Sequence, residues 1–313
     1  MNCRETVGMQ ISVVVPTLNG RDQLSSCLDR LTAEAPDAEI IVVNGPSADG
    51  TTGMVRDRDD VDVLVEVSAR TVNVARNAGI EVASGGVIAF VSYDLRIEDG
   101  WRTAVIDGLT EAPVVTGPTH RTVTGGMTTE SAEQRQIARR DVTYFSGGNV
   151  AFEADVLAEL DGFDEYLETG GARDAAHRLA GMGVDVAWQP EMSVCSEYEA
   201  DGGQTQRDWG WKYRSLSYRL VKNYGVRPTI LRRTATHAVG DAADTARDVI
   251  GGEAQPTEWF GTGRDVISGI ATGISDGLVS RARDRTPARN PHGISKRADR
   301  AVARYDWRPS TET

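Results

Sequence analysis

Three apolar runs near the start of the chain each lead directly into side chains that suit ligand binding. After the runs 11–15, 39–43 and 87–91 these side chains are, in order, Pro16, Thr17 and Asn19; Asn44; and Ser92, Tyr93 and Asp94. Open α/β sheets bind ligands at the carboxyl ends of their strands, and a carboxylate there suits a hard divalent cation. The spacing therefore predicts a ligand and metal site at one edge of a sheet, with Asp94 as the metal ligand.

The rest of the first two hundred residues alternates between helix-like and strand-like patterns. In 21–33, for example, Leu24, Leu28 and Leu31 recur on one helical face. Helices are predicted at 21–33, 50–57, 71–83, 101–109, 154–160 and 173–182, and strands at 11–15, 39–43, 61–65, 87–91, 114–117, 149–152 and 184–188. The polar stretch 118–143 is predicted to be a loop with one short helix. This alternation predicts an α/β protein with a mainly parallel sheet flanked by helices.

Four motifs carry a resemblance to a known family. They are VVVPTLN at 13–19, EIIVVN at 39–44, PSADGT at 46–51 and ARNAGIEVASGGVIAFV at 75–91. In this order and spacing they resemble the nucleotide-binding half of family 2 glycosyltransferases of the GT-A fold. The resemblance covers about residues 10–215. It implies a GT-A domain at 10–225, with a nucleotide half at about 10–117 and an acceptor half at about 118–225, after a loose extension at 1–9.

The resemblance implies transfer of a sugar from a UDP-sugar with the help of Mg²⁺ or Mn²⁺. Family members usually carry Asp-x-Asp where this chain has Ser92, Tyr93 and Asp94. Asp94 would then bind the metal, with diphosphate oxygens and water as further ligands. Ser92 would contact the ribose or a metal-bound water. An aspartate at this point equally suits a turn or helix cap before Leu95.

The nucleotide contacts follow from the same resemblance. The polar residues after the first run would lie against the ribose or the base. Asn44 stands where relatives have an aspartate that recognises uracil, and Asp49 matches a family aspartate in the next turn. Asp49 also suits capping of the helix that starts at Gly50. Arg76 would pair with phosphate, or with Asp94 or Asp49.

The general base is the weakest match to the family. Relatives carry an acidic pair before a helix, and alignment on Arg178 puts Gly171 and Ala172 at that pair. Asp174 is the remaining carboxylate, so we predict that it takes the proton of the acceptor hydroxyl, with His177 one turn away to assist. The alternatives are that Asp174 is a first-turn carboxylate stabilised by the helix dipole and that His177 is structural.

An acceptor-facing segment is predicted at 204–211. QTQRDW at 204–209 resembles the Gln-x-x-Arg-Trp of processive family members, with one residue inserted. Arg207 would supply charge, and Trp209 and Trp211 would supply apolar or sugar contact. Processive members also carry membrane spans, and no stretch here approaches the roughly 18 apolar residues that a span needs. We therefore do not expect chain polymerisation.

Composition indicates a salt-adapted protein of the cytosol. The 313 residues carry a net charge of −12, and only three of the 34 basic residues are lysine. Such a surface suits a salt-rich cytosol, although a GC-rich genome would also replace lysine by arginine. The three cysteines are scattered and have no metal-binding spacing, which is typical of a reducing compartment. The amino terminus has no apolar signal region.

The region 226–313 is predicted to be helical and partly basic. Helical patterns occur at 237–250 and 264–283, and an apolar stripe runs through 259–278. Between 207 and 233 there are eight basic residues and one acidic residue, and between 281 and 308 nine and three. These segments predict peripheral contact with an anionic membrane surface. The alternatives are that the arginines pair with carboxylates of the body and that the helix with the apolar stripe simply packs on the body. Sparse aromatic residues argue against nucleic acid.

These features predict a glycosyltransferase that moves a sugar, with a hexuronic acid such as glucuronate as candidate, from a UDP-sugar to a saccharide linked to dolichol or polyprenyl phosphate. Inverting, direct displacement is implied by the family. The chain resembles archaeal enzymes that assemble N-linked glycans of surface-layer glycoproteins at the cytoplasmic face of the membrane. The main alternative is a non-catalytic homologue that binds nucleotide or a partner enzyme, since both acidic motifs are altered. Nucleotidyltransferases and dinucleotide-binding dehydrogenases require a glycine-rich loop after the first strand, and the residues that follow the run 11–15 do not form one. The oligomeric state is not predicted.

Overall fold

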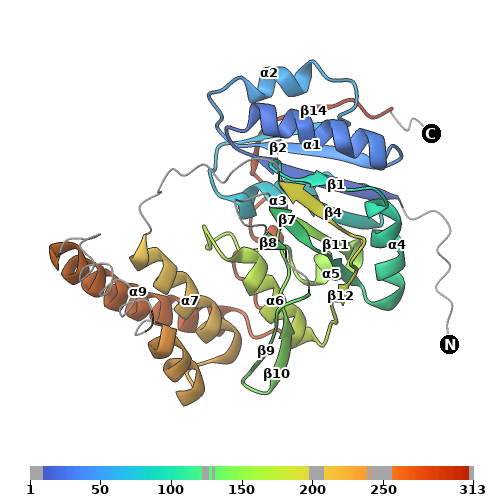
Figure 1. Ribbon diagram of the computed structural model, residues 1–313. Helices are drawn as coiled ribbons and strands as arrows, with labels where there is room; N and C mark the ends of the chain where they lie inside the picture. Colours follow the sequence, from blue (N-terminus) through green and yellow to red (C-terminus); the bar gives the residue numbers. More distant parts are fainter. Residues whose placement is uncertain are drawn as a thin grey trace. The chain divides into compact units, whose positions relative to one another are not determined.

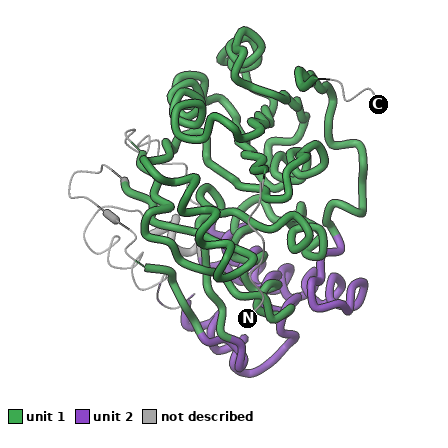
Figure 2. The backbone as a smooth tube through the Cα atoms, turned by 90° about the vertical axis from the view of Figure 1, so that its right-hand side faces the viewer, with its two compact units in different colours: residues 1–135, 141–202, 292–313 green, residues 136–140, 203–291 purple. Residues whose placement is uncertain are grey.

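A computed structural model of the chain describes residues 10–121, 127–128, 131–196, 208–237, 240 and 256–309 (Figure 1). The chain divides into two compact units (Figure 2). Unit 1 comprises residues 1–135, 141–202 and 292–313, and unit 2 comprises residues 136–140 and 203–291. The predicted extension at 1–9 lies outside the described residues, and the predicted division at 225 stays a prediction.

An eight-stranded sheet forms the centre of unit 1, in the order β12-β6-β11-β4-β1-β2-β3-β14. Its strands are β1 (Ile11–Thr17), β2 (Glu39–Asn44), β3 (Val63–Val67), β4 (Val87–Val91), β6 (Val114–Thr116), β11 (Asn149–Glu153), β12 (Ala187–Trp188) and β14 (Ala301–Asp306). The four strands β4, β1, β2 and β3 are parallel, as are β6 and β12. β11 runs antiparallel to β4 and β6, and β14 runs antiparallel to β3. The predicted α/β class with a mainly parallel sheet is confirmed.

The helices of unit 1 connect these strands. They are α1 (Arg21–Glu34), α2 (Thr51–Arg56), α3 (Val72–Ile80), α4 (Trp101–Glu111), α5 (Ala154–Glu159) and α6 (Gly171–Met182). Every residue of β1, β2 and β4 is buried, as expected of parallel strands covered on both faces. On α1, the predicted apolar face with Leu24, Leu28 and Leu31 is fully buried in the core.

The described residues of 118–143 form strands instead of the predicted loop and short helix. β7 (Thr119–Arg121) belongs to a four-stranded sheet in the order β5-β13-β7-β8, with β5 (Arg96–Ile97), β8 (Met127–Thr128) and β13 (Val194–Ser196). β9 (Gln134–Ile137) and β10 (Arg140–Thr143) form a hairpin whose turn residues Ala138 and Arg139 have positive φ angles of 49° and 70°. The prediction was wrong because the parallel partner of β7 is β13, far along the chain, so that no local pattern marks the strand.

The last described segment returns to unit 1. β14 extends the sheet beyond β3, and the amide of Trp307 donates a 2.9 Å hydrogen bond to the carbonyl of Asp62. The fully buried guanidinium of Arg300 pairs with Glu81 and Glu165. The prediction of a helical region up to 313 misses this strand, because its alternating sequence AVARYD lies at a half-exposed sheet edge.

Unit 2 is built around α7 (Trp209–Tyr224) and α9 (Pro256–Arg283), which pack together, with further helical residues at 228–237. Buried glycines allow the approach: a Cβ atom at Gly269 would lie 2.2 Å from the Gly210 carbonyl oxygen, and one at Gly273 would lie 2.3 Å from that of Arg214. The apolar stripe predicted for this helix is not the face against α7, since Ile267 is 71% exposed. No helix among the described residues is long and apolar enough to cross a membrane.

Candidate functional site

The carboxyl ends of β2, β1 and β4 lie next to one another in unit 1. β1 is hydrogen-bonded to β2 on one side and to β4 on the other, and Thr17 is in register with Asn44. The fold therefore places the polar residues that follow the three apolar runs at one edge of the sheet, as the sequence predicts.

Two glycines pack against the loop that follows β4. A Cβ atom at Gly20 would lie 2.1 Å from Cε2 of Tyr93, and one at Gly148 would lie 2.8 Å from Cβ of Ser92. The Ser92 amide also donates a 3.1 Å hydrogen bond to the Gly148 carbonyl. Because a larger residue at either glycine would collide with Tyr93 or Ser92, the two glycines allow the backbone path that leads to Asp94.

The carboxylate of Asp94 is not used by any protein group among the described residues. The residue is partly buried, and its side chain forms no hydrogen bond or ion pair within the described part of the chain. The alternative interpretation was that the Asp94 side chain caps the turn before Leu95. The Leu95 amide instead donates to the backbone carbonyl of Ser92 at 3.0 Å. Burial, and then the charge of Asp94, raise the pKa of the Cys27 thiol, which is therefore not a candidate nucleophile.

Arg76 of α3 is a buried cation that no carboxylate neutralises in the described residues. Its Nη1 donates to Asn73 Oδ1 at 3.2 Å and its Nη2 donates to the Gly147 carbonyl at 2.8 Å, while Nε is buried without a partner. The guanidinium lies 5.0 Å from the ring centroid of Phe163. Burial lowers the pKa of Arg76 to about 10, so the group stays charged at neutral pH. The predicted pairing with Asp94 or Asp49 does not occur, which leaves the charge available to a bound anion.

Thr17 is a second unsatisfied polar group at this edge. The residue is 4% exposed, and its Oγ1 is buried with no hydrogen-bond partner. Buried hydroxyl groups without partners are uncommon in native proteins. A ligand that supplies a partner to Thr17 would account for it. Pro16, the preceding residue, lies within β1 opposite Val43.

Asn44 forms hydrogen bonds within its own loop. Its Oδ1 accepts from the Ser47 hydroxyl at 2.7 Å, and its Nδ2 donates to the Thr52 hydroxyl at 2.9 Å. The residue is 1% exposed. These contacts show Asn44 shaping the turn after β2, and recognition of uracil by Asn44 stays a prediction.

Asn19 and Asp49 tie the loops after β1 and β2 together. Asn19, at φ 54°, accepts from the Ala48 amide at 2.8 Å. The Asp49 carboxylate accepts from the amide of Arg21 at 3.0 Å and from the hydroxyl of Thr51 at 2.6 Å. Asp49 thus has the capping contacts of the alternative reading, and a ligand contact by either residue stays a prediction.

Asp174 forms a fully buried ion pair with Arg178. Its Oδ2 lies 2.8 Å from Arg178 Nε, and both side chains are 0% exposed. His177 is also buried, with Nε2 3.4 Å from the Tyr144 hydroxyl. The Asp174 contacts favour a structural carboxylate, because the buried ion pair with Arg178 occupies an oxygen atom of the carboxylate that would have to accept the proton. The assignment of Asp174 and His177 to catalysis stays a prediction.

The predicted acceptor residues belong to unit 2. Trp209 and Trp211 lie in the first turn of α7, where Asp208 Oδ1 accepts from the Trp211 amide at 2.8 Å and caps the helix. Arg207, with the rest of the motif at 204–207, lies outside the described residues. Their role toward an acceptor stays a prediction.

The sequence analysis missed the glycine pair before β11. Gly147 adjoins Arg76, since a Cβ atom there would lie 2.5 Å from Nη2, and Gly148 adjoins Ser92. The same Cβ atom would lie 3.1 Å from Cβ of Ala172, which places the start of α6 beside this loop. The signal that was available is the run Ser146-Gly147-Gly148 directly before an apolar strand.

At the carboxyl ends of β1, β2 and β4, Asp94 is the carboxylate among the described residues that we consider as a ligand of a divalent cation. No group of three or more His, Cys, Asp or Glu side chains suited to a metal exists among the described residues. Asp94 fits an ion such as Mg²⁺ or Mn²⁺ whose other ligands are donor phosphate oxygens and water, because hard cations accept all of these.

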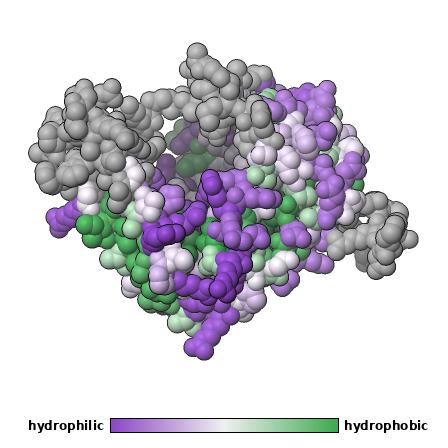
Figure 3. Space-filling model, turned by 60° about the horizontal axis from the view of Figure 1, so that its bottom comes forward, coloured by the Kyte–Doolittle hydropathy of each residue, from purple (hydrophilic) through white to green (hydrophobic). Residues whose placement is uncertain are grey.

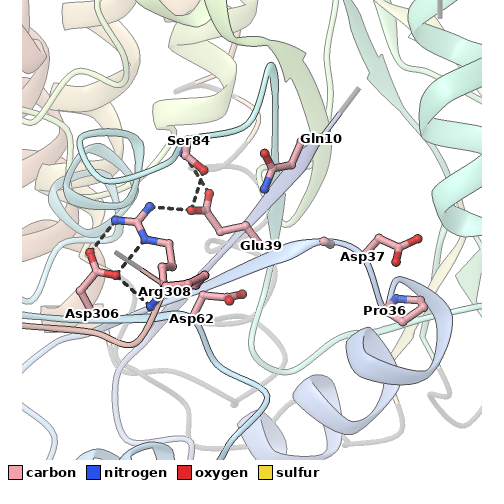
Figure 4. Close-up of a pocket in the computed structure, with 10 residues that line it drawn as sticks. Gln10, Pro36, Asp37, Glu39, Asp62, Ser84, Asp306 and Arg308 are labelled. Carbon is pink, nitrogen blue, oxygen red and sulfur yellow. Dashed lines mark hydrogen bonds and ion pairs between the residues drawn. The ribbon is translucent and has the colours of Figure 1, made fainter. Parts of the chain in front are cut away.

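A cavity of about 810 Å³ lies at the opposite edge of the sheet (Figure 4). It is lined by residues that precede or begin the parallel strands, including Gln10, Glu39 and Ser84. Arg308 crosses it and pairs with Glu39 at 2.6 Å and with Asp306 at 2.5 Å. Since ligands of open α/β sheets bind at the carboxyl ends, this cavity is not the site described above.

Comparison with known proteins agrees with this geometry. The model of the family "Glycosyl transferase family 2" matches residues 12–159. Glycosyltransferase AglE of Haloferax volcanii is 26% identical over 203 residues, which cover 59% of this chain and 66% of AglE.

Solved structures share the fold over most of the chain. The mannosyltransferase PcManGT from Pyrobaculum calidifontis, in complex with GDP-Man and Mn²⁺, has a TM-score of 0.56 at 18% identity, covering 87% of this chain and 89% of that one. Residues 1–349 of S. aureus TarS, in complex with UDP-GlcNAc, have a TM-score of 0.62 at 15% identity, covering 88% and 92%. These likenesses establish the GT-A fold.

Proposed function

Because the chain belongs to glycosyl transferase family 2, we propose that it transfers a sugar from UDP to a saccharide carried on dolichol or polyprenyl phosphate. The step that we propose is part of the assembly of an N-linked glycan for a surface-layer glycoprotein, and the distant similarity to AglE supports a role in archaeal glycan assembly. The protein would work peripherally at the cytoplasmic face of the membrane. A hexuronic acid such as glucuronate is the donor sugar that we propose.

The observation that carries this proposal is the pair of uncompensated charges at the carboxyl edge of the sheet. Asp94 has a carboxylate free of hydrogen bonds, and Arg76 has a buried guanidinium free of carboxylates, among the described residues. A nucleotide diphosphate with its divalent cation carries both complementary charges. Its phosphate would satisfy Arg76, and its cation would bind Asp94.

In this mechanism the protein positions the donor and neutralises the leaving group. Asp94 would hold the divalent cation, which would supply positive charge to the leaving diphosphate. Arg76 adds a second positive charge at the phosphates, and the Thr17 hydroxyl donates to the nucleotide. Tyr93 and Ser92, held against Gly20 and Gly148, position Asp94.

The acceptor hydroxyl must lose a proton as it attacks the anomeric carbon. Asp174 stays our proposed base, with His177 beside it on α6. For Asp174 to act, the ion pair with Arg178 would have to loosen when substrates bind. Arg207, Trp209 and Trp211 are proposed to contact the acceptor.

A non-catalytic homologue is the second candidate, and one observation favours it. Gly171 and Ala172 stand at the family's acidic pair, and Asp174 is committed to Arg178. Such a protein would bind the nucleotide through Asp94 and Arg76 without transferring sugar.

Release of UDP in the presence of Mg²⁺ or Mn²⁺, across a panel of UDP-sugars and polyprenyl-phosphate acceptors, tests the proposal. Asp94→Asn should lower the rate about 10²–10³-fold, the range for loss of one group that stabilises transition-state charge. Asp107→Asn, an exposed position on α4, is the matched control and should keep the wild-type rate. Acceptor-independent UDP binding with no transfer from any donor would instead favour the non-catalytic homologue.

A further inference from the structure

Four arginines of unit 2 belong to segments around the ends of α7 and α9, and Arg140 and Arg281 both contact the last turn of α7. Arg227 follows α7, Arg281 is in the last turn of α9, Arg289 follows α9, and Arg140 begins β10. Burial, and then the charges of Arg227 and Arg140, lower the pKa of Arg281. Burial, and then the charges of Arg281 and Arg140, lower the pKa of Arg289. We call these four residues the arginine cluster.

The contacts of the cluster leave its charge uncompensated. Arg140 lies over the ring of Tyr224, with its guanidinium 5.5 Å from the centroid. None of the four arginines forms an ion pair with a carboxylate within the described part of the chain. Arg281 uses Nη1 for the carbonyls of Lys222 and Asn223, at 3.0 and 3.3 Å, where it caps α7. These carbonyls provide hydrogen-bond partners for Arg281, but they carry no formal charge and so do not neutralise any of the four guanidinium groups.

Arg289 provides the most direct sign of a missing partner. Its Nε is buried and has no hydrogen-bond partner. Asp284 is the acidic residue whose charge acts on it, yet the two carboxylate oxygens of Asp284 accept from the Thr286 amide and hydroxyl and from the Asn290 amide. Asp284 therefore shapes the turn after α9 instead of pairing with Arg289.

We propose that the arginine cluster is a binding site for a phosphoryl group. Four like charges repel one another when brought together, so the arrangement is stabilised by an anion that neutralises it. Guanidinium groups donate planar pairs of N–H bonds, which match phosphate oxygens. The cluster belongs to unit 2, whereas Asp94 and Arg76, the residues of the proposed diphosphate site, belong to unit 1.

The surroundings of the cluster favour a phosphoryl group on a lipid headgroup over one in solution. Val226 precedes Arg227 and is 49% exposed, and Leu278 and Val279, one turn before Arg281, are each 45% exposed. Figure 3 shows one face of the molecule, on which hydrophobic and strongly hydrophilic side chains lie next to one another. Apolar side chains beside basic ones suit the boundary between headgroups and acyl chains. The inference deepens the proposed function, because a lipid-phosphate acceptor carries such a group.

The experiment measures binding of the full chain to two probes. One is inorganic phosphate, titrated calorimetrically; the other is phosphatidylcholine vesicles with and without phosphatidate, assayed by co-sedimentation in the same salt. The double variant Arg140→Gln/Arg227→Gln removes two cluster charges. Arg232→Gln/Arg264→Gln removes two exposed charges from unit 2 outside the cluster and is the matched control; Arg264 lies about 25 Å along α9 from Arg281.

We expect the cluster variant to bind its probe about tenfold more weakly and the control to bind within twofold of wild type. Cluster-dependent binding of phosphatidate vesicles alone identifies a headgroup site, and cluster-dependent binding of inorganic phosphate identifies a site that also takes soluble phosphate. Equal losses in the two variants, or no binding of either probe, would overturn the inference. Asp94→Asn should bind these probes as wild type does while losing sugar transfer, so failure of the proposed function and failure of this site are distinguishable.

Discussion

Replacement of Arg76 by glutamine should weaken the binding of UDP and leave the free energy of unfolding nearly unchanged. Arg76 is a buried cation whose counter-charge is absent from the described residues, and burial already lowers its pKa to about 10. A group held in this way contributes little to folding, because the cost of desolvating its charge opposes its hydrogen bonds. Its benefit appears when an anion binds.

The magnitude follows from the contacts. A hydrogen bond to a charged group contributes about 1.5–3 kcal/mol, so loss of one guanidinium–phosphate contact should weaken UDP binding by about 10–150-fold. Stability should change little. The variant loses the bonds to Asn73 Oδ1 and the Gly147 carbonyl, while it no longer buries an unpaired charge. We expect these effects to offset to within about 1 kcal/mol.

Calorimetric titration with UDP and Mn²⁺, together with urea unfolding, measures both quantities. Arg76→Lys keeps the charge but presents a single nitrogen, so its affinity should fall between those of Arg76→Gln and wild type. Arg102→Gln, a partly exposed arginine of α4, is the matched control and should leave UDP affinity unchanged.

The reasoning would be refuted by the reverse pattern. If Arg76→Gln unfolds several kcal/mol more easily and still binds UDP normally, Arg76 is a structural residue that holds the Gly147 loop. The phosphate assignment would then be lost.

Three further predictions concern single side chains. Asp174→Asn should destabilise the protein by about 3–5 kcal/mol, because it leaves the fully buried Arg178 unpaired. Urea unfolding measures this loss, with Asp155→Asn, at an exposed position, as the control. If the variant keeps wild-type stability and loses only sugar transfer, the assignment of Asp174 as the base is favoured instead. Burial raises the pKa of Glu39, but hydrogen bonds from Ser12, Ser84 and Arg308 outweigh it and lower the value, so its contribution to stability is present above the unfolded pKa of about 4.3 and is lost as pH falls through the folded value. Glu39→Gln should therefore flatten the fall in unfolding free energy below about pH 5, and an unchanged pH slope would contradict the assignment. Gly148→Ala should displace Ser92, whose Cβ would lie 2.8 Å from the new methyl group. The variant should lose about 1–3 kcal/mol of stability and should transfer sugar more slowly. Gly86→Ala, whose methyl group would meet nothing within 4 Å, is the control and should leave stability and transfer rate unchanged.

Regular local patterns allowed much of unit 1 to be predicted. The continuous apolar runs of β1, β2 and β4 and the apolar face of α1 each lie within one short segment, so their burial could be inferred residue by residue. Two strands with weak local signals, β7 and β14, were missed. β7 pairs with β13 far along the chain, and β14 lies at an exposed sheet edge beside β3, where burial does not mark its sequence.

The same distinction applies to the site. Asp94 and Arg76 were identified from their motifs, but the sequence offered Arg76 two carboxylates as partners, and the structure pairs it with neither. The commitment of Asp174 to Arg178 also depended on burial, because the same spacing of four residues occurs on exposed helices, where such a pair is weak.

The sequence by itself determined the parallel strands β1, β2, β3 and β4, the polar residues at their carboxyl ends and the family that these motifs resemble. Tertiary structure decided which of those residues keep unused charge. Within the described part of the chain, Asp94 has no hydrogen-bond partner, and Arg76 donates to Asn73 and to a backbone carbonyl in place of a counter-ion. The arginine cluster arises in the same way, since Arg140 and Arg281 are far apart in sequence and both contact the last turn of α7 in the fold. Burial and long-range contact set the electrostatic state of a side chain, and neither can be read from its neighbours in sequence.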